Sequence, residues 1–131
     1  MMPDVEVIRS DETIQEAAKK LARLNIGAMP ICDGENLRGM LTDRDIVTKV
    51  IAEGKDPSKV TARDLETGEP VWVGADSSLE DAMHTMAHNK VRRLPVIDSN
   101  RKLVGMLSQA DVVKALPKEK AGEMVEAISR D

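Results

Sequence analysis

Two pairs of residues in this chain combine a hydroxyl group with a carboxylate at the same spacing: Thr42 with Asp45, and Ser108 with Asp111. The spacing is that of a helix capping box, in which both side chains satisfy free backbone groups at the start of a helix. A helix start can also bind phosphate, because it offers unpaired N–H groups and a partial positive charge. A carboxylate one turn into that helix can accept hydrogen bonds from two sugar hydroxyls. Capping and binding are compatible, so both interpretations stay open.

Basic residues accompany the second of these pairs. Arg92 and Arg93 lie at the start of the preceding predicted hairpin, where the first half of the chain has a glycine and an alanine. Arginine presents a planar fork of donors that suits phosphate, although two exposed arginines at a strand edge are the alternative. The first pair has Arg44 beside its carboxylate, but the neighbouring Asp43 weakens the local positive field. We therefore rank the second pair above the first as a phosphate site.

Both pairs belong to an internal repeat that covers most of the chain. Residues 11–33 match residues 76–98 with an offset of 65, and residues 37–47 match residues 103–113 with an offset of 66. The extra residue falls in a predicted hairpin turn, where a change of length costs little. Such a repeat predicts two related halves about a pseudo-twofold axis, with two related clefts where the halves meet.

Composition excludes several classes of protein. A chain of 131 residues makes one compact domain or two small halves that share a core. The single cysteine excludes a disulfide framework and a cysteine-based zinc site. A net charge of −4, with one tryptophan and no other aromatic residue, argues against duplex or single-stranded nucleic acid as a partner. No apolar run approaches the roughly 20 residues of a membrane span, so the cytoplasm is the expected location.

Helix and strand signals occur in the same order in both halves. A capping box at Thr13 opens a helix to about Asn25, for which Gly27 is the expected stop. The matching helices should bury Ile14, Ala17, Ala18, Leu21 and Ala22 in the first copy, and Leu79, Ala82, Met83, Met86 and Ala87 in the second. Strands are expected at 28–32, 37–41, 71–73, 94–97 and 103–107, with further helices at 42–53, 61–65, 77–89 and 111–116.

Each copy is therefore strand, helix, strand, strand, helix, which predicts an α+β fold of two β-α-β-β-α repeats. We assign residues 1–57 to the first repeat with its connector and residues 58–116 to the second. Residues 117–131 are assigned to a C-terminal helix without a counterpart in the first copy, which would pack on the module or across a dimer.

Several stretches of the chain resemble one family. The sequence Gly-Met-Leu-[Ser/Thr]-x-x-Asp occurs at 39–45 and 105–111, and residues 91–98 read Val-Arg-Arg-Leu-Pro-Val-Ile-Asp. Residues 5–116 resemble a tandem cystathionine-β-synthase (CBS) domain pair, or Bateman module, of the kind found as stand-alone bacterial proteins. The resemblance implies a regulatory module that binds an adenosine-containing ligand, AMP, ADP, ATP or S-adenosylmethionine, in the clefts between repeats. It also implies a homodimer.

The resemblance assigns roles to the residues considered above. Asp45 and Asp111 would bind ribose, Thr42 and Ser108 would contact phosphate or ribose, and the basic residues Arg44, Arg92 and Arg93 would meet the phosphates. The adenine ring needs a dry slot, for which matching positions suggest Val71 with Met106 in one copy and Val7 with Met40 in the other. The alternative for these four residues is ordinary core packing.

No catalytic or metal site is predicted. His84 and His88 stand four residues apart on one helix face, a spacing that can bind zinc, but without a third ligand a solvated or dimer-facing pair is favoured. Cys32 is interpreted as a buried residue of the core. Because no nucleophile has an identifiable base, the chain is predicted to be a sensor of adenine nucleotides and not an enzyme. The alternative is a dimerising protein-interaction module without a ligand, and either function calls for an unidentified protein partner.

Overall fold

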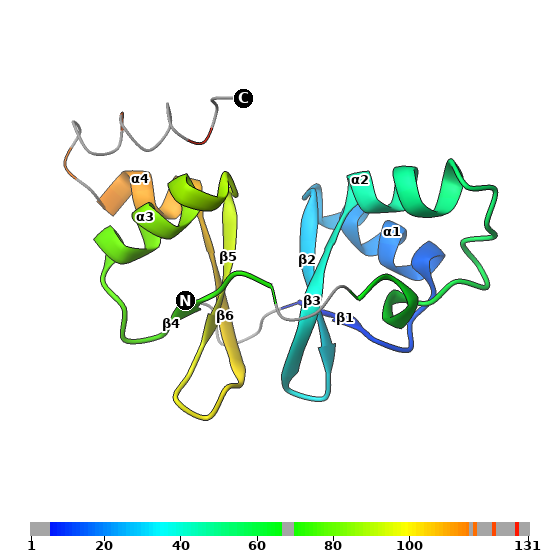
Figure 1. Cartoon of the computed structure of the whole chain (residues 1–131), viewed down its shortest axis with the longest axis horizontal. Helices are drawn as coiled ribbons and strands as arrows, with labels where there is room; N and C mark the ends of the chain where they lie inside the picture. Colours follow the sequence, from blue (N-terminus) through cyan, green and yellow to red (C-terminus); the bar gives the residue numbers. More distant parts are fainter. Residues whose placement is uncertain (1–5, 67–69, 116, 118–121, 123–127, 129–131) are drawn as a thin grey trace. The chain divides into compact units, whose positions relative to one another are not determined.

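The computed structural model describes residues 6–66, 70–115, 117, 122 and 128, and the chain folds as two compact units. One unit runs from Glu6 to Pro70, and the other begins at Val71. Each unit holds a three-stranded sheet and the helices of one repeat (Figure 1). The predicted α+β fold with two β-α-β-β-α repeats is therefore confirmed, whereas the pseudo-twofold axis stays a prediction.

The sheet of the first unit has the order β1-β2-β3, with strands Ile8–Arg9, Ala28–Asp33 and Asn36–Thr42. β1 pairs with β2 in parallel, and β2 pairs with β3 as an antiparallel hairpin. The hairpin turns through Gly34, whose φ of 63° is a left-handed conformation that glycine adopts without steric cost. The sheet contributes Ile8, Met29, Ile31 and Leu41 to the core of this unit.

Helix α1 (Ile14–Leu24) begins at the predicted capping box of Thr13 and Glu16. Its predicted stop at Gly27 is wrong: the chain turns at Asn25, which is left-handed with a φ of 53°. Asparagine tolerates this conformation better than most residues, so it can take the place of glycine at the end of a helix. Ile14, Ala17 and Leu21 are buried as predicted, but Ala18 is half-buried and Ala22 is exposed.

The second helix of the first unit is irregular. The predicted helix to Glu53 is an α-helix only over Asp43–Ile46 (α2), continues as a π-helical segment over Val47–Ile51 (η1), and ends there. The hydroxyl of Thr48 donates a hydrogen bond to the Arg44 carbonyl at 2.9 Å, a contact that is known to bend helices. Val50 is buried by this arrangement, whereas Val47 and Ile51 remain exposed.

The connector after η1 packs on the first unit. The amide of Ile14 donates to the carbonyl of Val60 at 2.8 Å, and that of Ala62 donates to the carbonyl of Glu12 at 2.9 Å. The predicted short helix at 61–65 is a 3₁₀ helix, Ala62–Leu65 (η2), capped by Thr61. These contacts explain why the compact unit extends to Pro70, while the boundary between residues 57 and 58 stays a prediction about the repeat.

The second unit repeats the plan with the sheet order β4-β5-β6, formed by strands Val73–Gly74, Arg93–Ile97 and Leu103–Ser108. Helix α3 (Leu79–Asn89) is capped by Ser78, and helix α4 (Gln109–Ala115) follows β6. Met86, Leu94 and Val112 are fully or almost fully buried. Leu79 was predicted to be buried, but it is the first residue of α3 and is 40% exposed.

Most of the predicted C-terminal helix, 117–131, lies outside the described residues. Ile128 is described, is helical, and joins the buried cluster of the second unit with 6% of its surface exposed. Among the helices of the described part of the chain, none is both long and apolar enough to span a membrane.

Candidate functional site

The polar residues predicted for the second repeat come together where β5 and β6 pair. Arg93 lies opposite Ser108 in the antiparallel register. The amide of Gln109, the first residue of α4, donates to the carbonyl of Arg92 at 2.7 Å. Backbone pairing alone therefore holds both arginines beside the start of α4, where Ser108 and Asp111 lie.

Ser108 and Asp111 form the predicted capping interaction. The amide of Ser108 donates to Asp111 Oδ2 at 3.1 Å, and the amide of Asp111 donates to Ser108 Oγ at 3.1 Å. The bonds from the backbone and side chain of Ser108 hold the pKa of Asp111 below its usual value, so the carboxylate is charged at neutral pH. Its Oδ1 has no hydrogen-bond or ion-pair partner among the described residues and is available to accept further bonds.

The first repeat builds the same cap with different surroundings. The amide of Thr42 donates to Asp45 Oδ2 at 3.1 Å, and the amide of Asp45 donates to Thr42 Oγ1 at 3.0 Å. Here the second carboxylate oxygen is engaged, because Asp45 Oδ1 lies 3.3 Å from Lys49 Nζ. Ala28 lies opposite Thr42, so the strand that pairs with this cap supplies no arginine at that position. A ligand would have to compete with Lys49 for Asp45, which agrees with the lower rank given to this site.

The ion pair of Asp45 with Lys49 was missed in the sequence, although its spacing of four residues on a helix is a recognisable signal. Arg44 was named as a candidate in this repeat. Its side chain is exposed and has no ion-pair partner among the described residues, while its amide donates to Asp43 Oδ1 at 2.8 Å.

Of the four apolar residues predicted to contact adenine, only the two methionines occupy equivalent positions in the two repeats. Met40 lies opposite Pro30 and Met106 lies opposite Pro95, so these two half-buried methionines occupy matching places. The matching of Val7 with Val71, in contrast, is wrong. Pairing of Ile8 with Ile31 and of Val73 with Val96 makes Ile8 the counterpart of Val73, and therefore makes Val7 the counterpart of Trp72. Val71 itself precedes β4 and is 39% exposed.

The indole ring of Trp72 contacts a basic side chain, which the sequence did not predict. The guanidinium of Arg101, in the β5–β6 turn, lies 5.3 Å from the centre of the indole ring, within range of a cation–π contact. Val7 has a polar contact of its own, because its carbonyl accepts a hydrogen bond from Lys20 Nζ at 2.9 Å.

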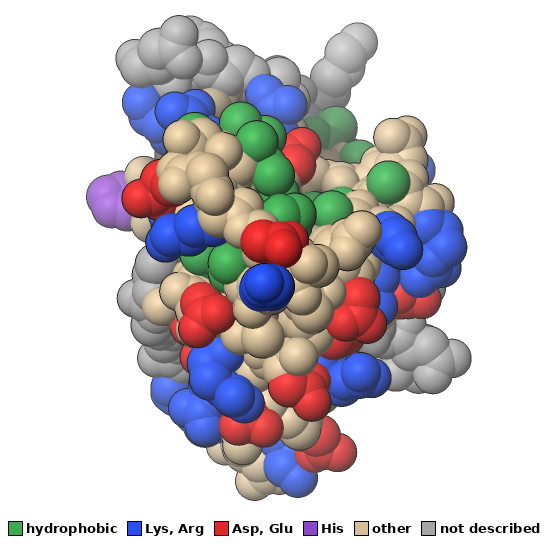
Figure 2. All heavy atoms as spheres, turned by 90° about the vertical axis from the view of Figure 1, so that its right-hand side faces the viewer, with side chains coloured by type: hydrophobic (Ala, Val, Ile, Leu, Met, Phe, Trp, Pro, Cys, Tyr) green, Lys and Arg blue, Asp and Glu red, His purple; other side chains and the backbone are tan. Residues whose placement is uncertain are grey.

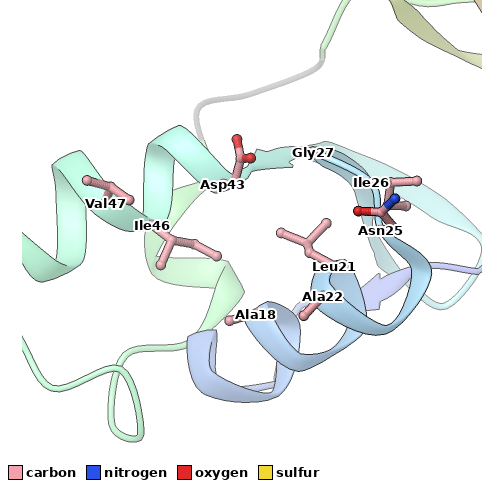
Figure 3. Close-up of a pocket in the computed structure, with 9 residues that line it drawn as sticks. All are labelled: Ala18, Leu21, Ala22, Asn25, Ile26, Gly27, Asp43, Ile46 and Val47. Atoms are coloured by element: carbon pink, nitrogen blue, oxygen red, sulfur yellow. The ribbon is translucent and has the colours of Figure 1, made fainter.

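Two pockets lie within the individual repeats. One of about 480 Å³ lies between α1 and α2 of the first repeat (Figure 3), and one of about 140 Å³ lies beside the start of α3 in the second. Neither pocket is lined by any of the eleven residues predicted to bind a nucleotide. The predicted nucleotide contacts thus belong to surfaces other than these two pockets.

The two histidines and the cysteine considered in the sequence show no sign of a metal site among the described residues. His84 and His88 are both exposed on α3. Within the described ranges of the chain, no cluster of three or more histidine, cysteine, aspartate or glutamate residues could hold a metal ion. Cys32 is 2% exposed in β2, and burial raises the pKa of its thiol to about 11, as expected of a core residue.

Comparison with known proteins identifies the family. The model of the CBS domain matches residues 1–52 and 62–118. Hypoxic response protein 1 of Mycobacterium tuberculosis is 40% identical over 129 residues, which span 98% of this chain and 90% of that protein.

Solved structures support the same assignment. The crystal structure of hypoxic response protein I with two coordinated zinc ions matches with a TM-score of 0.81 and 41% identity, over 89% of this chain and 95% of that one. CBSX2 of Arabidopsis thaliana in complex with AMP matches with a TM-score of 0.72 and 28% identity, over 86% of this chain and 87% of that one. A hexameric cyanobacterial CBS-CP12 protein matches with a TM-score of 0.68 and 27% identity, over 86% of this chain and 63% of that one. The chain therefore belongs to the CBS domain family and is a tandem CBS-pair protein of the regulatory, non-catalytic kind.

Proposed function

We propose that this chain is a regulatory module that binds an adenine nucleotide, AMP, ADP or ATP. The observation that carries the proposal is the juxtaposition of Arg93 with Ser108 at the start of α4, beside a carboxylate with one oxygen to spare. Arginine, hydroxyl and carboxylate residues thus meet at one helix start, and these are the residue types that recognition of both phosphate and ribose requires.

Each part of the nucleotide has a proposed contact in the second repeat. Arg92 and Arg93 supply positive charge for the phosphates, and Ser108 supplies a hydroxyl. Asp111 can keep its cap through Oδ2 while Oδ1 accepts hydrogen bonds from the ribose. Met106 and Val71 remain the proposed contacts of the adenine ring. The first repeat offers the weaker set, which consists of Val7, Met40, Thr42, Arg44 and Asp45.

A relative supports this choice of ligand, since CBSX2, at 28% identity, has been crystallised in complex with AMP. In this chain the nucleotide would regulate by binding two conformations with different affinity, and it could shift their populations only by that difference. The partner that senses the change would be another protein.

Titration calorimetry with AMP, ADP, ATP and S-adenosylmethionine tests the proposal. We expect Asp111→Ala to weaken binding of the preferred nucleotide by at least tenfold, about 1.4 kcal/mol, because a charge-assisted contact to ribose is lost. The same change removes a helix cap, which by itself costs about 0.5–2 kcal/mol of stability.

Asp64→Ala is the matched control. Asp64 accepts the amide of Thr61 at 3.0 Å in another capping box, which lies in the connector and outside the proposed site. The control should lose stability and keep nucleotide affinity. Equal affinities of Asp111→Ala and the wild type would refute the ribose contact, and no heat with any of the four ligands would favour the alternative, an interaction module without a ligand.

We further propose that the protein is a cytoplasmic homodimer. The single cysteine, a free and buried thiol, suits a reducing compartment. A related CBS-CP12 protein is a hexamer, so self-association occurs in this family.

A further inference from the structure

The small pocket beside the start of α3 leaves part of the core of the second repeat open. It measures about 140 Å³ and lies among β4, the turn that follows it, α3, β5 and β6. One of its lining side chains, Leu79, is 40% exposed. The larger apolar side chains and the buried alanine of the lining are Val73, Leu79, Ala82, Val96 and Leu107.

The same five positions of the first repeat enclose a side chain from the connector. The internal repeat and the strand pairing match them, in order, with Ile8, Ile14, Ala17, Ile31 and Leu41. All five are 0% exposed, and Ala62 of η2, which is also 0% exposed, belongs to the same cluster. The open pocket of the second repeat therefore corresponds to the space that Ala62 helps to fill in the first.

The turn before each helix shows the same difference in burial. Three alternate residues of this turn are buried in the first repeat, and their counterparts in the second are exposed. The pairs are Ser10 with Ala75, Glu12 with Ser77, and Ile14 with Leu79. The described part of the chain thus covers this turn in the first repeat alone.

Backbone groups that hold the cover in the first repeat are unused in the second. The connector is hydrogen-bonded to the amide of Ile14 at 2.8 Å and to the carbonyl of Glu12 at 2.9 Å. The corresponding amide of Leu79 and carbonyl of Ser77 have no hydrogen-bond partner among the described residues. A donor and an acceptor therefore lie beside an apolar pocket, which is how a protein recognises a short extended segment.

Charge narrows the chemistry of the missing cover. The connector buries Ala62 but exposes Lys59 and Arg63, and charged side chains of both signs cover much of the first repeat's face in Figure 2. The border of the open pocket is acidic, since three exposed carboxylates lie in or next to the start of α3: Asp76, Glu80 and Asp81. A cationic neighbour of the buried side chain would be attracted to this border.

We infer that the pocket docks a short segment of a partner protein with the chemistry of the connector, an alanine-sized apolar side chain followed directly by a basic one. The apolar side chain occupies the place that corresponds to Ala62. The segment's backbone pairs with Leu79 and Ser77, and its basic side chain faces the acidic border. This inference goes beyond the proposed function and does not depend on nucleotide binding.

NMR titration of the ¹⁵N-labelled whole chain with a synthetic peptide tests it. The peptide has the sequence of residues 57–65, with both ends blocked, and so contains Ala62 and Arg63. Leu79→Asp places a charge on the wall of the pocket, and an acidic residue in the first turn of a helix is compatible with folding. Ile51→Asp is the matched control, because Ile51 is an aliphatic residue of the first repeat that is 54% exposed.

We expect saturable shifts of the amide signals of Ala75, Leu79 and Ala82. The dissociation constant should rise at least tenfold for Leu79→Asp and for a peptide with Ala62→Asp, and stay unchanged for Ile51→Asp. Absence of shifts at millimolar peptide, or binding that tolerates Leu79→Asp, would overturn the inference. Signals of Leu79 that move with protein concentration alone would make a second copy the occupant, and would overturn the assignment to a different protein.

Discussion

Arg93 lies directly opposite Ser108 in the antiparallel pairing of β5 with β6, whereas Ala28 lies opposite Thr42 in the first repeat. The two backbones are equivalent, so a single substitution decides whether the residue opposite the cap is an arginine or an alanine. Lys49 adds to the contrast, because it lies 3.3 Å from Asp45 Oδ1, whereas Asp111 Oδ1 has no ion-pair partner among the described residues. The two repeats thus differ at their caps: the second has an arginine opposite its hydroxyl residue, and the carboxylate of the first takes part in its own ion pair.

Arg93→Ala should weaken binding of AMP and ATP more than binding of adenosine. A charge-assisted contact to phosphate is worth about 1.5–3 kcal/mol, or roughly tenfold and more in affinity. Titration calorimetry with the three ligands measures the difference. Arg63→Ala, at an exposed arginine of the connector, is the control and should change none of the affinities. Equal losses for adenosine and AMP would indicate a distorted cleft and no phosphate contact.

Lys20→Met should destabilise the protein by about 1.5–3 kcal/mol at neutral pH, because it removes a hydrogen bond to a buried charge. Glu12, whose side chain is 3% exposed, accepts Lys20 Nζ at 2.6 Å and the amide of Arg9 at 3.0 Å. Burial raises the pKa of Glu12, but these bonds and the nearby positive charges more than offset it, so the pKa lies below its ordinary value of 4.5.

The sign of the pH dependence follows from that lowered pKa. A carboxylate with a lowered pKa stabilises the folded state fully above its unfolded pKa, and the stabilisation is lost as the pH falls through the folded value. The difference in unfolding free energy between wild type and Lys20→Met should therefore shrink below about pH 4.5. Urea unfolding at a series of pH values measures this difference in unfolding free energy. Lys19→Met, which changes the exposed neighbouring lysine, is the control. A difference that stays constant into acid would contradict this account.

Lys90→Gly should stabilise the protein by about 1 kcal/mol, because lysine at this position is held in the left-handed conformation, which costs residues other than glycine about 1–2 kcal/mol. Lys90 ends α3 with a φ of 53°, and Asn25 ends α1 with the same φ. Asn25→Gly is the natural control and should gain less, since asparagine tolerates this conformation. Chemical denaturation measures both variants, and a loss of stability in Lys90→Gly would count against the assignment.

Cys32 should not react with an aromatic disulfide reagent in the folded protein. Its thiol is 2% exposed, and burial raises its pKa to about 11, so little thiolate is present at neutral pH. Absorbance of the released thiolate should rise only when denaturant unfolds the chain. A rapid stoichiometric reaction without denaturant would mean that β2 opens easily.

Much of this protein was predictable from short stretches of sequence. The caps at Thr13, Thr42 and Ser108, the hairpin turns and the order of the elements all depend on residues within a few positions of one another. The repeat added the family and the polar residues of the candidate site. At the end of α1, both Gly27 and Asn25 are residue types that can end a helix, and the local sequence predicted the wrong one of the two.

What only the tertiary structure decided is which side chains meet and which stay exposed. The pairing of Arg93 with Ser108 joins residues 15 positions apart, and the burial of Glu12 depends on Lys20 and on the connector. The exposure of Leu79, and the open groove beside Val47, likewise depend on what other elements place against each helix. Turns and caps are satisfied by neighbours along the chain, so a sequence specifies them locally, whereas burial and charge pairing are set by segments that meet only after folding.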